Sequence, residues 1–89
     1  MRTPAPPELL DRYAAVLFDL AVRHGLSQLR HGGRGTIVAE VEPGRTLTDL
    51  AHFELEAESL LGHDVFVVSS DAPAAAQLAG APLTASHAA

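Results

Sequence analysis

Apolar residues recur at three- and four-residue spacing near the start of the chain, and this spacing predicts an amphipathic helix. The helix is expected to begin at Pro6-Pro7-Glu8, because proline is tolerated in a first helical turn, and to end at His24-Gly25. Its buried face is expected to comprise Leu9, Leu10, Tyr13, Val16, Leu17, Leu20 and Ala21.

Two short strands and a glycine-rich loop are expected next. Residues 26–30 are a strand candidate, residues 32–35 (Gly-Gly-Arg-Gly) a flexible loop, and residues 36–41 a second strand with alternating apolar side chains. The Pro43-Gly44 pair then predicts a turn that ends the second strand.

A second helix is specified at both of its ends. Thr46 provides an N-cap, Asp49 places a carboxylate near the positive end of the helix dipole, and Gly62 closes the helix after Leu61. Its buried stripe is expected to be formed by Leu47, Leu50, Phe53, Ala57, Leu60 and Leu61.

The C-terminal part of the chain combines a valine-rich segment with a weakly patterned end. A strand is expected from Asp64 to Ser69, followed by a turn and by one or two helical turns at residues 74–79. Pro82 discourages further helix, and the residues after it lack apolar periodicity. Residues 1–79 are therefore predicted to form a single domain and residues 80–89 a flexible C-terminal tail.

The composition is that of one small domain. The chain has 89 residues, a formal net charge of −5 and no cysteine. A core of this size is modest, so self-association is expected to support it. The negative charge argues against nucleic acid, which requires clustered cations, and no apolar run reaches membrane-spanning length. We therefore expect a cytoplasmic protein that binds neither nucleic acid nor a membrane.

Residues 39–69, AEVEPGRTLTDLAHFELEAESLLGHDVFVVS, closely resemble the second half of a minimal nucleotidyltransferase (MNT) domain. That family has a strand, a Glu-Pro-Gly-Arg turn (here residues 42–45), a Leu-rich acidic helix and a short valine-rich strand. Residues 20–35 resemble its helix end, first strand and Gly-Ser loop. The resemblance implies an α/β (α+β) fold that is a truncated nucleotidyltransferase core of order α-β-β-α-β. This core has a three-stranded mixed sheet with two main helices on one face.

The resemblance implies a catalytic site whose ligands are missing here. The family needs a Gly-Ser loop for phosphates, an Asp-x-Asp pair for Mg²⁺ and a third Asp. Counted without a gap, these carboxylate positions fall on Arg34, Thr36 and Phe66. The Gly-Ser dipeptide falls on Gly32-Gly33, and the spacer after it is too short. Alternatively, residues 32–35 align with an intact loop and the Asp pair is deleted. Both alignments remove the metal site, so no metal and no cofactor are expected.

The first functional hypothesis is a catalytically inactive member of that family that acts as a protein-binding subunit. Active members that the chain resembles often serve as antitoxins that bind HEPN-type ribonuclease toxins and modify them with adenylate groups. The resemblance thus implies an antitoxin-like role toward a HEPN-type partner, with Glu54, Glu56 and Glu58 as the candidate partner surface. A three-stranded sheet would also leave a bare edge, which predicts a homo-oligomer such as a dimer.

Two other functions stay open. One is a metal-free enzyme that binds a small-molecule ligand in the vestigial pocket, with His31 as general base and Arg34 polarising an anion. The candidate residues of this pocket are His31, Gly32, Gly33, Arg34, Thr36 and Phe66. The other function is a nucleotide-binding sensor without transfer activity.

A possible metal-binding pair and the burial of Phe66 are also considered. His52 and Glu56 lie four residues apart on the second helix and could share a metal, but the sequence identifies no third ligand. Phe66 is expected to be buried, because both faces of its strand are apolar.

Overall fold

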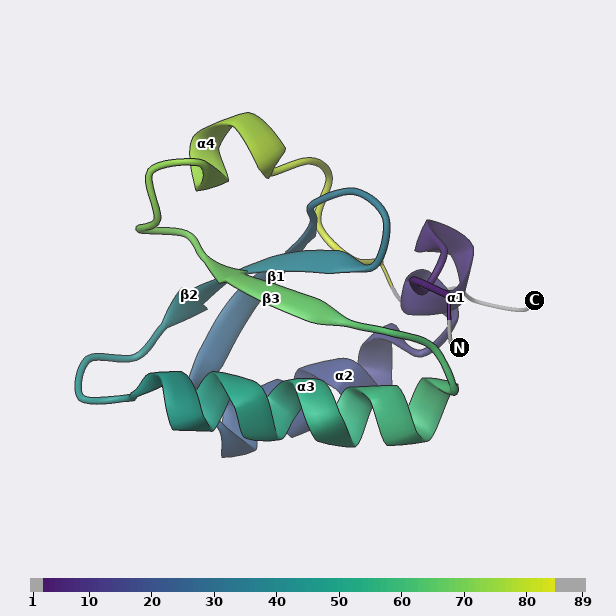
Figure 1. The fold of residues 1–89 in the computed structure, drawn as a ribbon, viewed down its shortest axis with the longest axis horizontal. Coiled ribbons are helices and arrows are strands. Elements are labelled where there is room, and N and C mark those ends of the chain that lie inside the picture. Colours follow the sequence, from purple (N-terminus) through teal and green to yellow (C-terminus); the bar gives the residue numbers. More distant parts are fainter. Residues whose placement is uncertain (1–2, 85–89) are drawn as a thin grey trace.

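The computed structural model describes residues 3–84 of the chain (Figure 1). In these residues the elements are α1 (Pro7–Arg12), α2 (Ala14–Arg23), β1 (Leu26–His31), β2 (Thr36–Val41), α3 (Leu47–Leu61), β3 (Phe66–Ser69) and α4 (Ala75–Leu78). The strand order is β1-β2-β3, with β1 antiparallel and β3 parallel to β2. This arrangement confirms the predicted α+β core with a mixed three-stranded sheet.

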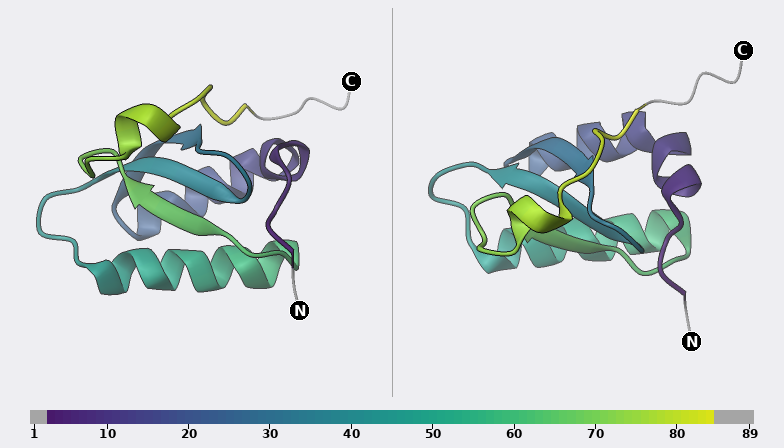
Figure 2. Two further views of the ribbon diagram at one scale, coloured as in Figure 1. Left: turned by 45° about the horizontal axis from the view of Figure 1, so that its top comes forward. Right: turned by 90° about the horizontal axis from the view of Figure 1, so that it is seen from above.

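The two faces of the sheet are covered differently. The longer helices α2 and α3 lie on one face, as predicted, and the short α4 lies on the other (Figures 1 and 2). Parallel strands need a crossover connection, and α3 provides it between β2 and β3. The core lies between the sheet and the longer helices, and its fully buried side chains include Leu10, Leu17, Ile37, Phe53 and Val65. None of the helices within residues 3–84 has the length and apolar character needed to cross a bilayer.

The predicted N-terminal helix is broken into two pieces. Tyr13, with φ −102° and ψ 16°, separates α1 from α2, so the expectation of one continuous helix is wrong at this residue. The α1 piece buries Leu10 in the core and directs Asp11 to His31 and to the Thr84 backbone. These contacts join residues far apart in sequence, and helical periodicity alone does not reveal them.

The helix α3 begins and ends where the sequence predicts. The Asp49 carboxylate accepts a hydrogen bond from the Thr46 N–H at 3.0 Å, and Gly62 ends the helix with φ 72°. The predicted stripe is too wide, because Leu47 is 83% exposed and Leu60 is 44% exposed. Leu60 points about 100° away from its buried neighbour Leu61 around the helix axis, on a side that is partly open to solvent.

Residues 80–84 are not the predicted flexible tail. They run along the outer edge of β1, where the Gly80 N–H donates to His31 O at 2.7 Å and the His31 N–H donates to Ala81 O at 2.9 Å (Figure 2). The Leu83 N–H donates to Leu29 O at 3.0 Å, and the Leu83 side chain is buried in the core. Pairing with β1 fixes this segment, and local periodicity carries no sign of it. The rest of the predicted tail, residues 85–89, lies outside the described residues.

Candidate functional site

The glycine-rich loop is a tight hairpin connection between β1 and β2. The Gly32 N–H donates to Thr36 O and the Thr36 N–H donates to Gly33 O, both at 2.8 Å. Gly33, Arg34 and Gly35 all have positive φ, at 88°, 32° and 76°. A phosphate-binding loop directs several backbone N–H groups at its ligand, and two of these groups close the hairpin here.

The N-terminal segment packs against this loop. A Cβ atom at Gly35 would lie 2.9 Å from Asp64 O and 3.0 Å from Ala5 N. The Ala5 N–H donates to Asp64 O at 3.0 Å, and the Asp64 N–H donates to Thr3 O at 2.9 Å. Residues 3–5 therefore occupy the space on one side of the loop, and only a residue without a side chain fits at position 35.

The residues predicted for the vestigial pocket are divided between the two faces of the sheet. Thr36 pairs with Phe66 across β2 and β3, and a Cβ atom at Gly32 would point to the same face, 2.8 Å from Thr36 Cγ2. His31 pairs with the buried Ile37, which belongs to the core between the sheet and the helices. Alternate strand residues face opposite sides, so His31 is turned away from Thr36 and Phe66. Two further candidates, Gly33 and Arg34, are exposed at the hairpin tip.

His31 is held by a carboxylate on α1. A hydrogen bond of 2.8 Å joins its Nε2 to Asp11 Oδ1, and the Thr84 N–H donates to the same oxygen at 3.0 Å. The bond from Thr84 is the main cause that holds the pKa of Asp11 below its usual value, and His31 adds to it. A His–Asp pair can act as a general base. In this structure it joins α1, β1 and residues 80–84, on the face away from Phe66.

Phe66 is 50% exposed, so the expectation that it is buried is wrong. On the same face, α4 covers the part of the sheet near Val38 and Ser70. A cavity of about 130 Å³ lies there, with Gln28, Arg30, Glu40 and Ser70 among its lining residues. None of the six predicted pocket residues lines this cavity. The polar residues Gln28 and Arg30, two apart on β1, are the sequence signal that could have pointed to it.

The residues present do not fit the Mg²⁺ site that the sequence resemblance implies. Arg34, Thr36 and Phe66 offer a guanidinium, a hydroxyl and a phenyl ring, whereas Mg²⁺ is bound through oxygen ligands such as carboxylates. Within residues 3–84, no three His, Cys, Asp or Glu side chains are grouped so that they could hold a metal ion. This includes His52 and Glu56, which the sequence suggested as a metal-binding pair.

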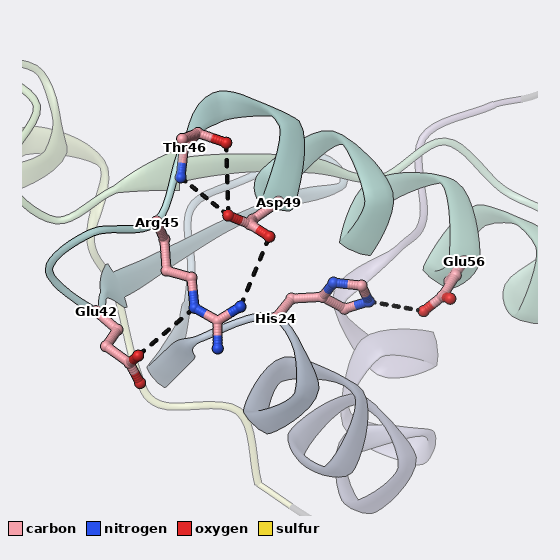
Figure 3. A network of polar contacts seen from close by, with 6 residues as sticks. All are labelled: His24, Glu42, Arg45, Thr46, Asp49 and Glu56. Carbon is pink, nitrogen blue, oxygen red and sulfur yellow. Dashed lines mark hydrogen bonds and ion pairs between the residues drawn. The ribbon is translucent and has the colours of Figure 1, made fainter.

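The three glutamates predicted to form a partner surface all have partners within the chain. Glu56 Oε2 lies 2.9 Å from His24 Nε2, which connects α3 to the end of α2 (Figure 3). Glu54 accepts a hydrogen bond from the Val67 N–H at 2.7 Å. Glu58 accepts one from the Val65 N–H at 3.1 Å. These side chains therefore hold α3 against its neighbours.

Arg45 of the Glu-Pro-Gly-Arg turn connects three segments (Figure 3). Its guanidinium lies 3.6 Å from the carboxylates of both Glu42 and Asp49. Its side chain crosses Gly25, where an added Cβ atom would lie 2.7 Å from Arg45 Cγ. The pKa of Asp49 is lowered, first by the Thr46 N–H bond and also by the Arg45 charge. The turn thus fixes β2 and α3 relative to the α2–β1 junction.

Comparison with known proteins reveals one extensive similarity. A scan of protein-family models gives no match, and a search of curated proteins also gives none. A solved structure, provisionally described as that of a minimal nucleotidyltransferase, matches with a TM-score of 0.68 and 32% sequence identity. The match covers 83% of this chain and 90% of that chain, so the similarity extends over most of both proteins.

Proposed function

The chain belongs to the minimal nucleotidyltransferase family, and we propose that it is a member without transfer activity that acts as a protein-binding subunit. The observation that carries the proposal is the pairing of Thr36 with Phe66, two positions where the resemblance expects metal-binding carboxylates. A hydroxyl and a phenyl ring do not replace them. Arg34 occupies the third position where the resemblance expects a carboxylate, and its positive charge would repel a metal cation.

The hairpin loop supports the loss of nucleotide transfer. Gly32 and Thr36 use their N–H groups inside the hairpin, and residues 3–5 pack beside Gly35. A triphosphate would need an open loop with its N–H groups directed outward. The loop as it stands favours a structural connection over a phosphate site, and it gives the nucleotide-sensor hypothesis little support.

The metal-free enzyme also has little support. It needs His31, Arg34 and Phe66 around one substrate, but His31 faces the helices and Phe66 faces the opposite side of the sheet. The ring of His31 is already engaged by Asp11.

The partner that the family resemblance implies is a helical HEPN-type ribonuclease. We propose that this chain retains binding to such a partner, in the manner of an antitoxin, and lacks the adenylate transfer. Three large apolar side chains on the outer sides of the helices are available for contact: Val22 is 73% exposed, Leu47 83% and Leu55 62%. Exposed apolar residues of this kind can supply the anchors of a protein interface.

Co-expression with a HEPN-type ribonuclease tests both parts of the proposal. We expect a stoichiometric complex by light scattering, a lower ribonuclease activity, and unchanged intact masses of both chains after incubation with Mg²⁺ and nucleoside triphosphates. A magnesium-dependent nucleotidyl adduct on either chain would contradict the loss of transfer. Two separate species at every concentration would contradict the binding role. Leu55→Asp should weaken the complex, and Glu8→Gln on the exposed side of α1 serves as the control.

A further inference from the structure

Each edge of the sheet is contacted by another segment of the same chain: one edge by a backbone segment and the other by side chains. The outer edge of β1 pairs with residues 80–83 of the same chain. The other edge of the described sheet is β3. An edge strand presents unpaired N–H and C=O groups to which another chain can add a strand.

The N–H groups on the outer side of this edge are those of Val65, directly before β3, and of Val67 and Ser69 within it. On the inner side, Phe66 donates to Gly35 O and Ser70 donates to Ala39 O, both at 2.8 Å. Successive residues of a strand direct their N–H groups to opposite sides. Val65, Val67 and Ser69 therefore direct theirs away from β2, and these are the donors that an added strand would need.

Two glutamates of α3 accept hydrogen bonds from the first two of these donors. Val65 donates to Glu58 Oε2 at 3.1 Å, and Val67 donates to Glu54 Oε2 at 2.7 Å. The spacing explains the match, because four helical residues rise about 6 Å and two strand residues rise about 6.6 Å. Both glutamates are half-buried against β3, whereas Glu56 between them is exposed and contacts His24.

We propose that Glu54 and Glu58 close the first part of the β3 edge, at Val65 and Val67, and prevent a second copy of this chain from adding a strand to the sheet there. Their oxygens occupy the acceptor positions that the carbonyl groups of an incoming strand would take. That strand would have to displace two charge-assisted hydrogen bonds and place its own carbonyl oxygens next to two carboxylates. Phe66, half exposed between the two bonded N–H groups, would otherwise offer apolar surface to the same contact. This inference concerns self-pairing and is independent of the proposed HEPN-type partner.

Amide hydrogen exchange, measured by NMR on the full chain, tests each bond separately. Glu54→Ala is expected to speed exchange about tenfold at Val67 and to leave Val65 unchanged, and Glu58→Ala should do the reverse. Glu54→Gln keeps an acceptor oxygen and should retain most of the protection. Glu56→Ala, on the same helix and with the same change in charge, should leave both amides unchanged. If the exchange rates of the Val65 and Val67 amides are unchanged in the Glu54→Ala and Glu58→Ala variants, the proposal is wrong.

Sedimentation velocity tests the consequence for association. The Glu54→Ala/Glu58→Ala variant, shown to be folded by circular dichroism, is expected to form a larger species whose fraction rises with concentration relative to the unsubstituted protein. Removing two carboxylates changes the net charge from −5 to −3. Glu8→Ala/Glu56→Ala makes the same change elsewhere and should associate no more than the unsubstituted protein. If the two double variants associate equally, or if Glu54→Ala/Glu58→Ala forms a smaller species than the control, the glutamates do not prevent strand addition at this edge.

Discussion

Thr36 and Phe66 are direct partners across the parallel strands β2 and β3. In the sequence alignment, Thr36 is placed at an expected carboxylate position by counting back from the Glu-Pro-Gly-Arg turn. Phe66 is placed at another by counting forward from the second helix. In the structure both lie at one place on the sheet, on the face opposite to that of Ile37, which belongs to the core. The two substitutions at expected carboxylate positions therefore alter a single patch.

The exposure of Phe66 leads to a prediction about stability. Phe53 is fully buried, whereas Phe66 is 50% exposed. Phe53→Ala is expected to lower the free energy of unfolding by about 3–5 kcal/mol, and Phe66→Ala by less than about 1 kcal/mol. Urea denaturation of both variants measures the difference. Similar losses would mean that Phe66 is covered in solution, which would contradict an open patch at this position.

A second prediction concerns the crossing of Arg45 over Gly25. Gly25 has φ +73°, and an added Cβ atom would collide with the Arg45 side chain, whereas Gly62 has φ +72° and open space around it. Gly62→Ala should cost about 1–3 kcal/mol from backbone strain alone, and Gly25→Ala should cost more. The excess should shrink when Arg45→Ala is introduced as well, because that change removes the collision. A thermal double-mutant cycle measures this coupling, and strictly additive losses would exclude the contact.

The parts of the fold that could be predicted from sequence are those specified by neighbouring residues. Thr46 and Asp49 mark the start of α3 and Gly62 marks its end, and each acts on the helical turn next to it. The strand at residues 36–41 is bounded by glycines on one side and by the Pro43-Gly44 turn on the other. Caps and turns of this kind act through interactions between neighbouring residues, so the sequence predicts them without knowledge of tertiary contacts.

The parts that could not be predicted depend on contacts between distant segments. The pairing of residues 80–84 with β1 and the bonds from Glu54 and Glu58 to the Val67 and Val65 N–H groups join residues that no periodicity relates. The break at Tyr13 interrupts a run of apolar residues whose periodicity continues through it. The arrangement of the candidate site could not be predicted from the sequence either. His31 and Thr36 are close in sequence, but the register of the hairpin turns them to opposite faces of the sheet.

The burial of Leu83 gives a third prediction. Leu83 is 4% exposed within the core, whereas Leu78 on α4 is 41% exposed. Leu83→Ala should therefore lower the free energy of unfolding by about 2–5 kcal/mol, and Leu78→Ala should cost much less. Chemical denaturation followed by circular dichroism compares them. If Leu83→Ala were as mild as Leu78→Ala, residues 80–84 would contribute nothing to the folded domain, as the sequence alone suggested.

The fourth prediction is a loss of stability in acid. The pKa values of Asp11 and Asp49 are both lowered from the ordinary value of 3.8, first by backbone hydrogen bonds from Thr84 and Thr46. A carboxyl group with a depressed pKa in the folded state stabilises the fold above its unfolded pKa. That stability is lost as the pH falls through the lower, folded value, so the melting temperature should decline below about pH 4.

Substitutions identify which carboxylates cause the acid sensitivity. Asp11→Asn and Asp49→Asn should each lower the melting temperature near neutral pH and flatten its decline in acid, because the ionised acceptor is gone. Thr84→Pro keeps the Asp11 carboxylate but removes the N–H group that bonds it at 3.0 Å. It should therefore flatten the same part of the profile as Asp11→Asn. A decline that stays as steep in Thr84→Pro as in the unsubstituted protein would show that the bond from Thr84 does not set the pKa of Asp11.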